Sequence, residues 1–303
     1  MYDTSDPRSR MAAAAAPAAT AAGAFTPAEI GRYYEDAPQR VAEGSKTWMT
    51  RGQAMVVAYT EAEPGAVLER TGQVDEYVLL LPDRDKGAEI EANGERRPVA
   101  GYSLVILPPG DSRIVLPDGG RVTRVFSSRS ADLNAACANA GSFGAEHPRI
   151  PPFKPWPDPV GGFKIRAYSL DVPPEKGRFG RIFRCTTVMV NYLDPQHGPR
   201  DIEKLSPHHH DDFEQGSLAL DGSFTHHLRW PWTTNLNVWR DDEHPHLASP
   251  SLIVIPPPAI HTSRGMEAGL NQLVDIFAPP RVDFSRQPGW VLNADEYPMP
   301  ADA

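Results

Sequence analysis

The chain has few cysteines, no long apolar run and no basic run, and each shortage excludes a class of protein. Two cysteines among 303 residues, Cys137 and Cys185, cannot form the disulfide framework of a small secreted protein, which fits a reducing compartment. No apolar stretch reaches the length that spans a membrane. The net charge is −9 and the basic residues are not clustered, which argues against nucleic-acid and membrane partners. We therefore expect a cytoplasmic protein.

The first part of the chain is rich in alanine. We expect residues 1–24 to be a disordered tail. A weak secretory signal is the alternative, but alanine is barely apolar and Pro17 interrupts the run. After this tract, Thr26, Pro27 and Glu29 have the pattern of a helix N-terminus: a cap, a proline at the first helical position and a capping box. We therefore predict a short helix here that packs on the next domain.

Proline and glycine are abundant, at 32 and 24 residues, which favours turns between short strands over long helices. Short apolar segments bounded by turn residues recur along the chain. In the first half they lie at residues 54–59, 76–81, 101–107 and 121–126. Regular spacing of this kind indicates an all-β barrel or sandwich.

The second half repeats a pattern from the first. Residues 103–109 read SLVILPP, and residues 251–257 read SLIVIPP. Farther along, Val125-Phe126 matches Ile276-Phe277 at nearly the same offset. The repeat indicates that one β-domain occurs twice in the chain.

A run of polar residues in the second half offers metal donors at alternate positions. Side chains two apart in a strand point the same way, so His208 and His210 share one space while His209 faces the other side. Glu214 can add a carboxylate after a bend, and His261 follows an apolar strand in a proline-rich turn. Imidazoles and a carboxylate are the ligands of catalytic divalent metals that keep open positions.

The order His-x-His, three residues, Glu and then a distant Pro-x-x-x-x-His resembles the two sequence motifs of the cupin superfamily. In cupins these motifs lie on the strands of a small β-barrel and bind one metal ion. The residues carried over as its ligands are His208, His210, Glu214 and His261. The sequence departs from the motifs at two glycines. Pro258 replaces one of them, and Gly222 lies one residue later than in the commonest spacing.

Since both halves contain the second motif, the resemblance implies a bicupin. Its expected fold class is all-β, with two tandem jelly-roll (double-stranded β-helix) barrels and a few short helices. The expected parts after the tail are an N-terminal barrel at 25–141, a Pro- and Gly-rich linker at 142–163, and a C-terminal barrel with its tail at 164–303. Cupins commonly dimerise, so the resemblance also implies a homodimer.

The N-terminal copy lacks the histidines. Arg113 stands at the motif-two histidine position, and residues 68–76 contain no histidine, although Glu76 or Asp75 can mark the glutamate position. Arginine has no free lone pair at neutral pH and cannot ligate a metal. We expect this barrel to be metal-free and structural; the alternative is that Arg113 binds an acidic ligand.

Polar residues after the first motif are candidates for the pocket wall. Alternation along residues 223–229 places either His227 and Arg229 or His226 and Leu228 inward. We favour His227 and Arg229 as pocket-lining catalytic groups, and a solvated strand edge is the alternative. Asp275 lies in the middle of the last apolar strand and faces either the pocket or the solvent.

The resemblance implies a metal that binds substrate oxygens, acts as a Lewis acid and keeps a position free for water or dioxygen. One divalent transition metal is expected; Fe(II) is favoured, and Mn, Ni, Co or Zn also suit these ligands. The favoured function is a non-haem Fe(II)-type dioxygenase acting on a small enol, catechol-like or oxo-acid substrate. The alternatives are an isomerase, epimerase or lyase acting on a sugar or uronic acid, and a non-catalytic protein that binds a small ligand.

Overall fold

The computed structural model describes residues 25–42 and 44–301, and the tail expected at 1–24 lies outside these ranges. The described chain contains 21 strands and four short helical segments. The helical segments are α2 (Ala131–Ala136), η1 (Ala140–Phe143), η2 (Leu236–Val238) and α3 (Val282–Ser285). The predicted all-β fold class is confirmed. None of the helices in these ranges is long and apolar enough to cross a membrane.

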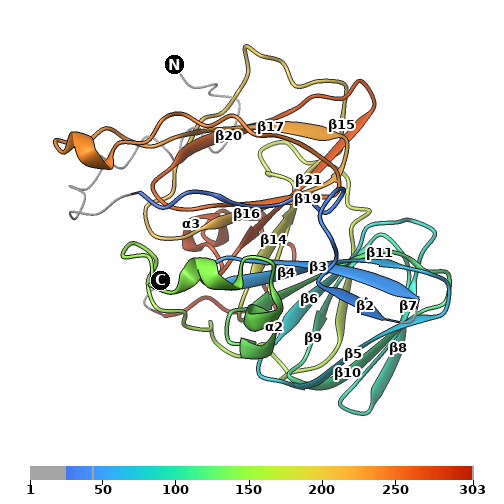
Figure 1. The fold of residues 1–303 in the computed structure, drawn as a ribbon. Helices are drawn as coiled ribbons and strands as arrows, with labels where there is room; N and C mark the ends of the chain where they lie inside the picture. Colours follow the sequence, from blue (N-terminus) through green and yellow to red (C-terminus); the bar gives the residue numbers. More distant parts are fainter. Residues whose placement is uncertain (1–24, 43, 302–303) are drawn as a thin grey trace.

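The first barrel consists of a seven-stranded and a four-stranded sheet (Figure 1). The larger sheet has the order β12-β9-β6-β11-β4-β3-β2, and the smaller has the order β5-β10-β7-β8. Their bounds are β2 Arg40–Ala42, β3 Ser45–Arg51, β4 Met55–Ala62, β5 Ala66–Gln73, β6 Tyr77–Leu81, β7 Ala88–Ala92, β8 Glu95–Val99, β9 Ser103–Leu107, β10 Gly110–Leu116, β11 Gly120–Ser127 and β12 Arg166–Ser169.

The second barrel repeats this arrangement. Its large sheet has the order β1-β19-β16-β21-β14-β13, with β15 paired to β21, and its small sheet has the order β18-β17-β20. Their bounds are β1 Glu29–Gly31, β13 Arg181–Arg184, β14 Met189–Tyr192, β15 Gln196–His197, β16 Gln215–Asp221, β17 Ser223–Arg229, β18 His246–Ala248, β19 Ser251–Ile255, β20 Ile260–Gly265 and β21 Leu270–Phe277. The order β9-β6-β11-β4-β3 corresponds to β19-β16-β21-β14-β13, so the repeat in the sequence is a repeat in the fold.

The two halves exchange one strand each. β1, from the start of the chain, pairs antiparallel with β19 of the second barrel, and β12 pairs antiparallel with β9 of the first (Figure 1). The sheets therefore cross the boundaries expected at 25–141 and 164–303. The helix predicted from Thr26 to Glu29 was wrong, because the edge of the fully buried β19 accepts this segment as a strand. Pairing with a sheet outweighed the local capping signals.

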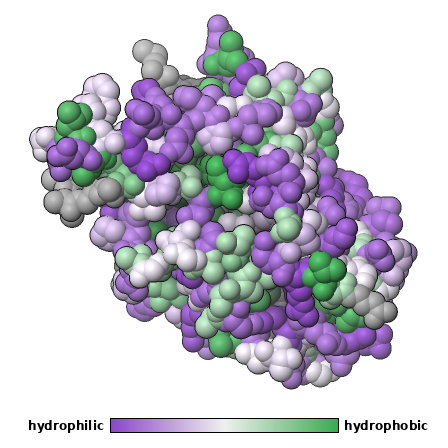
Figure 2. Space-filling model, in the orientation of Figure 1, coloured by the Kyte–Doolittle hydropathy of each residue, from purple (hydrophilic) through white to green (hydrophobic). Residues whose placement is uncertain are grey.

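Alternation along the strands separates two kinds of core. In β6, Val78 and Leu80 pack in the apolar layer between the two large sheets, together with Leu218 and Leu220 of β16. The opposite face of β6 looks into the first barrel, whose interior is filled by one large apolar cluster. In the second barrel the apolar residues form three smaller clusters instead. Figure 2 shows an outer face on which hydrophilic residues are widespread, as expected for a molecule whose apolar area is buried between and inside sheets.

A candidate metal centre in the second barrel

Three of the four predicted ligands meet inside the second barrel. His208, His210 and His261 are buried, and one ring nitrogen from each lies within 4.8 Å of the others. Backbone pairing brings the two motifs together. The His208 amide donates to the His261 carbonyl at 3.0 Å, and the His261 amide donates back at 2.7 Å. The alternate spacing in the sequence therefore predicted this cluster correctly.

The imidazoles are oriented by carbonyl groups of the main chain. His208 Nδ1 lies 2.9 Å from the Ser206 carbonyl oxygen, and His261 Nδ1 lies 2.9 Å from that of Ala259. A carbonyl only accepts, so Nδ1 carries a proton in both rings, and in the neutral ring Nε2 is left with its lone pair. Metal-binding histidines are commonly held in this way.

The ionisation state of the cluster also suits a metal. Burial, followed by the positive charge of Arg281 and the neighbouring imidazoles, lowers the pKa of His210 well below its usual value. The ring is therefore neutral at pH 7, as a metal ligand must be. Three buried imidazoles that face one space form a donor set that fits a divalent transition metal.

Glu214, the fourth predicted ligand, is not part of this group. Its Oε2 accepts a hydrogen bond from the Gln53 amide at 2.8 Å, and its Oε1 accepts one from the Ala54 amide at 2.7 Å. A Cβ on Gly52 would lie 2.2 Å from Oε1, so this loop closes tightly over the carboxylate. Glu214 immediately precedes β16 and is turned toward the first barrel. In the structure this carboxylate makes a contact between the barrels and lies outside the histidine cluster.

The next residue, Gln215, faces the imidazoles instead. Its Oε1 lies 2.9 Å from His210 Nε2, and its Nε2 donates to Ser217 Oγ at 2.9 Å and to Asp275 Oδ1 at 3.1 Å. Counted from Gln215, the glycine at position 222 falls at the commonest spacing of the first cupin motif. That one-residue offset was the signal in the sequence that could have identified this position.

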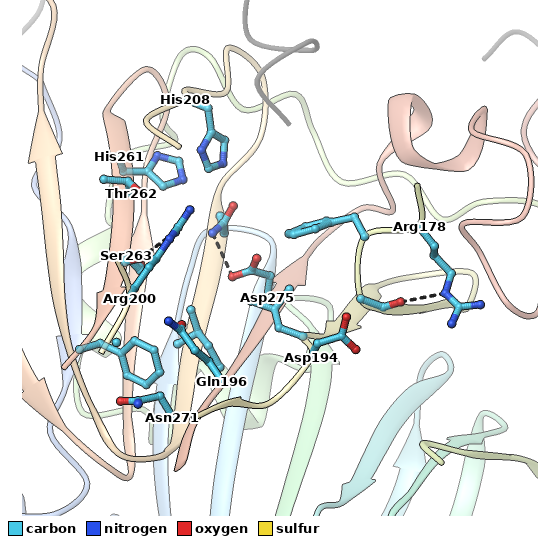
Figure 3. Close-up of a pocket in the computed structure, with 17 residues that line it drawn as sticks. Arg178, Asp194, Gln196, Arg200, His208, His261, Thr262, Ser263, Asn271 and Asp275 are labelled. Carbon is cyan, nitrogen blue, oxygen red and sulfur yellow. Dashed lines mark hydrogen bonds between the residues drawn. The ribbon is translucent and has the colours of Figure 1, made fainter. Parts of the chain in front are cut away.

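A cavity of about 230 Å³ lies beside His208 and His261 (Figure 3). Asp275 points into it, which resolves the choice that the sequence left open. Other polar residues around the cavity are Arg178, Asp194, Gln196, Arg200, Thr262, Ser263 and Asn271. The cavity therefore places cationic, anionic and amide groups next to the histidine cluster.

His227 and Arg229, predicted to be catalytic, lie on the other face of β17. His226 and Leu228 are buried, whereas Arg229 is exposed and its Nε donates to Asp242 Oδ1 at 3.0 Å. The strand therefore points His226 and Leu228 inward, which is the second alternation considered above, because only this phase buries Leu228. His227 and Arg229 border a separate cavity of about 180 Å³, which His261 also lines.

The interior of the first barrel is occupied by apolar side chains. Tyr77 stacks on Phe126 with ring centroids 4.7 Å apart, and its hydroxyl lies 2.7 Å from Ser112 Oγ. Arg113 is exposed, and its Nε lies 3.5 Å from a carboxylate oxygen of Glu69. Binding of an acidic ligand by Arg113 stays a prediction.

No family model and no curated relative matches the sequence. Solved structures do match. The oxalate decarboxylase–formate complex of Lactobacillus farciminis is 15% identical, with 86% of this chain and 88% of that chain covered and a TM-score of 0.55. A mutant of the Bacillus subtilis oxalate decarboxylase is 11% identical, with 86% and 78% covered and a TM-score of 0.53.

A third structure was described for the substrate binding mode and a reaction specificity switch in oxalate decarboxylase. It is 12% identical, with 89% of this chain and 83% of that chain covered and a TM-score of 0.56. At these identities the likeness establishes the fold alone. Together with the duplicated strand order, it shows that this chain has the bicupin fold, with a group of three histidines in its second barrel.

Proposed function

We propose that the protein is a metal-dependent bicupin enzyme whose second barrel holds one divalent transition metal. The observation that carries the proposal is the buried cluster of His208, His210 and His261 beside a cavity. Bound there, the metal would supply Lewis acidity and positions for substrate oxygens and dioxygen. The reaction we favour is that of a non-haem Fe(II)-type dioxygenase.

The cavity favours a small substrate that bears anionic oxygens. Its volume of about 230 Å³ is below the range of about 300–1,000 Å³ found for drug-sized ligands. Arg178 and Arg200 line it. Arg200 is held by the Ser263 carbonyl at 3.1 Å and by Ser206 Oγ at 2.9 Å, next to the strand of His261 (Figure 3). A guanidinium fixed in this way suits a carboxylate or enolate oxygen.

A second candidate is a non-redox lyase or isomerase. Two observations favour it: the three matching structures described above are of oxalate decarboxylases, and the clustered imidazoles carry no negative charge. Neutral donors leave the full charge of a divalent ion available to polarise a carbonyl. The substrate would again be a small carboxylic acid, such as a uronic or dicarboxylic acid.

Oxygen dependence separates the two candidates. The protein is purified without added metal, its metal content is measured, and it is loaded with Fe(II), Mn(II) or Zn(II). Catechols, enols, oxo acids and uronic acids are then supplied with and without oxygen, and products are read by mass spectrometry. Incorporation of labelled dioxygen is the expected result. Full turnover without oxygen, or with Zn(II), would replace the dioxygenase by the second candidate.

If the protein binds a small ligand but turns over no substrate with any of these metals, the third function remains, that of a non-catalytic binding protein.

We also propose that the protein is a homodimer that works in the cytoplasm. Light scattering of the purified protein and fractionation of the native cells test these two points.

A further inference from the structure

We infer that the amide oxygen of Gln215 is the fourth protein donor of the metal site, and that Asp275 is the residue that positions it. This inference rests on the proposed metal site and concerns how the site is completed. Neither residue is among the four ligands expected from the sequence, although Gln215 stands, counted back from Gly222, where the first motif places its glutamate.

The first argument is distance. Gln215 is 3% exposed, and its Oε1 lies 2.9 Å from His210 Nε2. The contact is a hydrogen bond in which the imidazole N–H donates, because an amide oxygen only accepts. The accepting oxygen is therefore buried directly beside the histidine cluster, where it can bind an ion in place of that proton. The carboxylate of Glu214, in contrast, is held by two main-chain amides of the first barrel.

The second argument is the orientation of the amide. A side-chain amide has one accepting end and one donating end, so its neighbours decide which end faces the imidazoles. The donating end of Gln215 reaches Asp275 Oδ1 at 3.1 Å and Ser217 Oγ at 2.9 Å. Ser217 Oγ donates to the same oxygen of Asp275 at 3.0 Å. A carboxylate only accepts, so Asp275 fixes the nitrogen on its side and turns the oxygen toward His210.

The same neighbours explain why position 215 holds glutamine. Asp275 lies opposite Ser217 in the register of β16 and β21, and it is 2% exposed. A glutamate at position 215 would place an anionic oxygen against Asp275 where the amide now donates. Two buried carboxylates in contact repel each other strongly. The negative charge therefore lies on Asp275, on the far side of the Gln215 amide from the imidazoles, and the donor oxygen of Gln215 is neutral.

Metal titration of purified variants tests this arrangement, with Co(II) as the probe because its visible spectrum reports the donors. Gln215→Leu is expected to lower Co(II) affinity by about 10–100-fold and to change the spectrum. Asp275→Asn is expected to lower the affinity by about 10-fold, since its amide can present either end to Gln215. Gln196→Leu is the matched control, because Gln196 lines the same cavity at the end away from His208 and His261 (Figure 3). It is expected to bind Co(II) as the unchanged protein does.

A charge exchange sharpens the test. Gln215→Glu alone is expected to bind Co(II) more weakly, and the double variant Gln215→Glu with Asp275→Asn is expected to recover the affinity. A residue that only supports the fold would change the thermal midpoint without this pattern in affinity and spectrum. If Gln215→Leu binds Co(II) with unchanged affinity and spectrum, the inference is wrong while the three-histidine site stands. If the unchanged protein binds no metal, the proposed function fails as well.

Discussion

The two barrels place very different side chains at equivalent positions. On β6, the residues that face the first barrel's interior are Tyr77, Leu79 and Leu81, which are fully buried in one apolar cluster. On β16, the corresponding inward positions hold Gln215, Ser217 and Ala219. The backbone topology is the same, so the chemistry depends on the side chains that point inward. One interior is a packed core, and the other is a polar site with a cavity.

The barrels remain alike where they touch. Glu214 of the second barrel accepts main-chain hydrogen bonds from the turn before β4. Glu76 of the first barrel accepts hydrogen bonds from the amide and hydroxyl of Thr186, in the turn before β14, and from Tyr297. Each glutamate directly precedes the strand compared above. The duplicated chain has therefore kept one pair of contacts between its barrels while the interiors diverged.

The largest expected effect comes from removing a histidine of the second barrel. A structural metal site with four ligands has a binding free energy of about 10–16 kcal/mol. One ligand therefore accounts for about 3 kcal/mol of it, which corresponds to a change in affinity of at least about 100-fold. His261→Ala is therefore expected to lower metal affinity by at least about 100-fold in calorimetric titrations. His209→Ala is the control, since His209 is adjacent to two ligands but lies outside the clustered group. Equal losses in both variants would contradict the assignment.

The next effect concerns the contacts that the barrels share. Glu214→Ala leaves the buried amide of Ala54 and the partly buried amide of Gln53 without their acceptor. Each unsatisfied donor costs about 1–3 kcal/mol, so we expect a loss of about 2 kcal/mol or more in the free energy of unfolding. Glu76→Ala should cost a similar amount. Urea unfolding measures both, and metal titration of Glu214→Ala should show nearly unchanged affinity. A 100-fold loss of affinity would instead return Glu214 to the ligand set.

The stability of the second barrel should fall in acid because of the buried His226. Burial lowers the pKa of His226 from 6.5 to about 3. Between these values the unfolded chain binds a proton that the folded chain does not, so stability present above pH 6.5 is lost as the pH falls. The loss is about 1.4 kcal/mol for each pH unit. In the metal-free protein, His226→Gln should therefore show a shallower pH dependence of the unfolding free energy, measured in urea between pH 7 and 5.

How far the sequence could predict this site depends on the residue type. His208, His210 and His261 were found because alternation in a strand and the cupin motifs both mark them. Gln215 is not marked in this way, because an amide is an unusual metal donor and the carboxylate of Glu214 stands beside it. The bend between His210 and β16 decides which of the two faces inward, and no local pattern encodes its length.

The phase of β17 and the start of β1 show the same limit. His226 and His227 are adjacent, so either phase of the strand points one histidine inward, and only the packing of Leu228 decides. From Thr26 to Glu29 the local signals favour a helix, but the open edge of β19 lies more than 200 residues away in the sequence. Pairing at such distances cannot be read from a local window.

The smallest effect is expected on the outer face of β17. Arg229 is 67% exposed at its side chain and paired with Asp242, so Arg229→Ala should leave metal affinity and turnover unchanged. Arg200→Ala, on the inner cavity, should lower turnover instead, because its guanidinium is fixed beside the strand of His261. The reverse pattern would mean that substrate reaches His261 through the cavity bordered by Arg229, since both cavities touch that imidazole. The difference between the barrels would then extend to the outer wall of the second one, where the first barrel has the exposed Arg113 paired with Glu69.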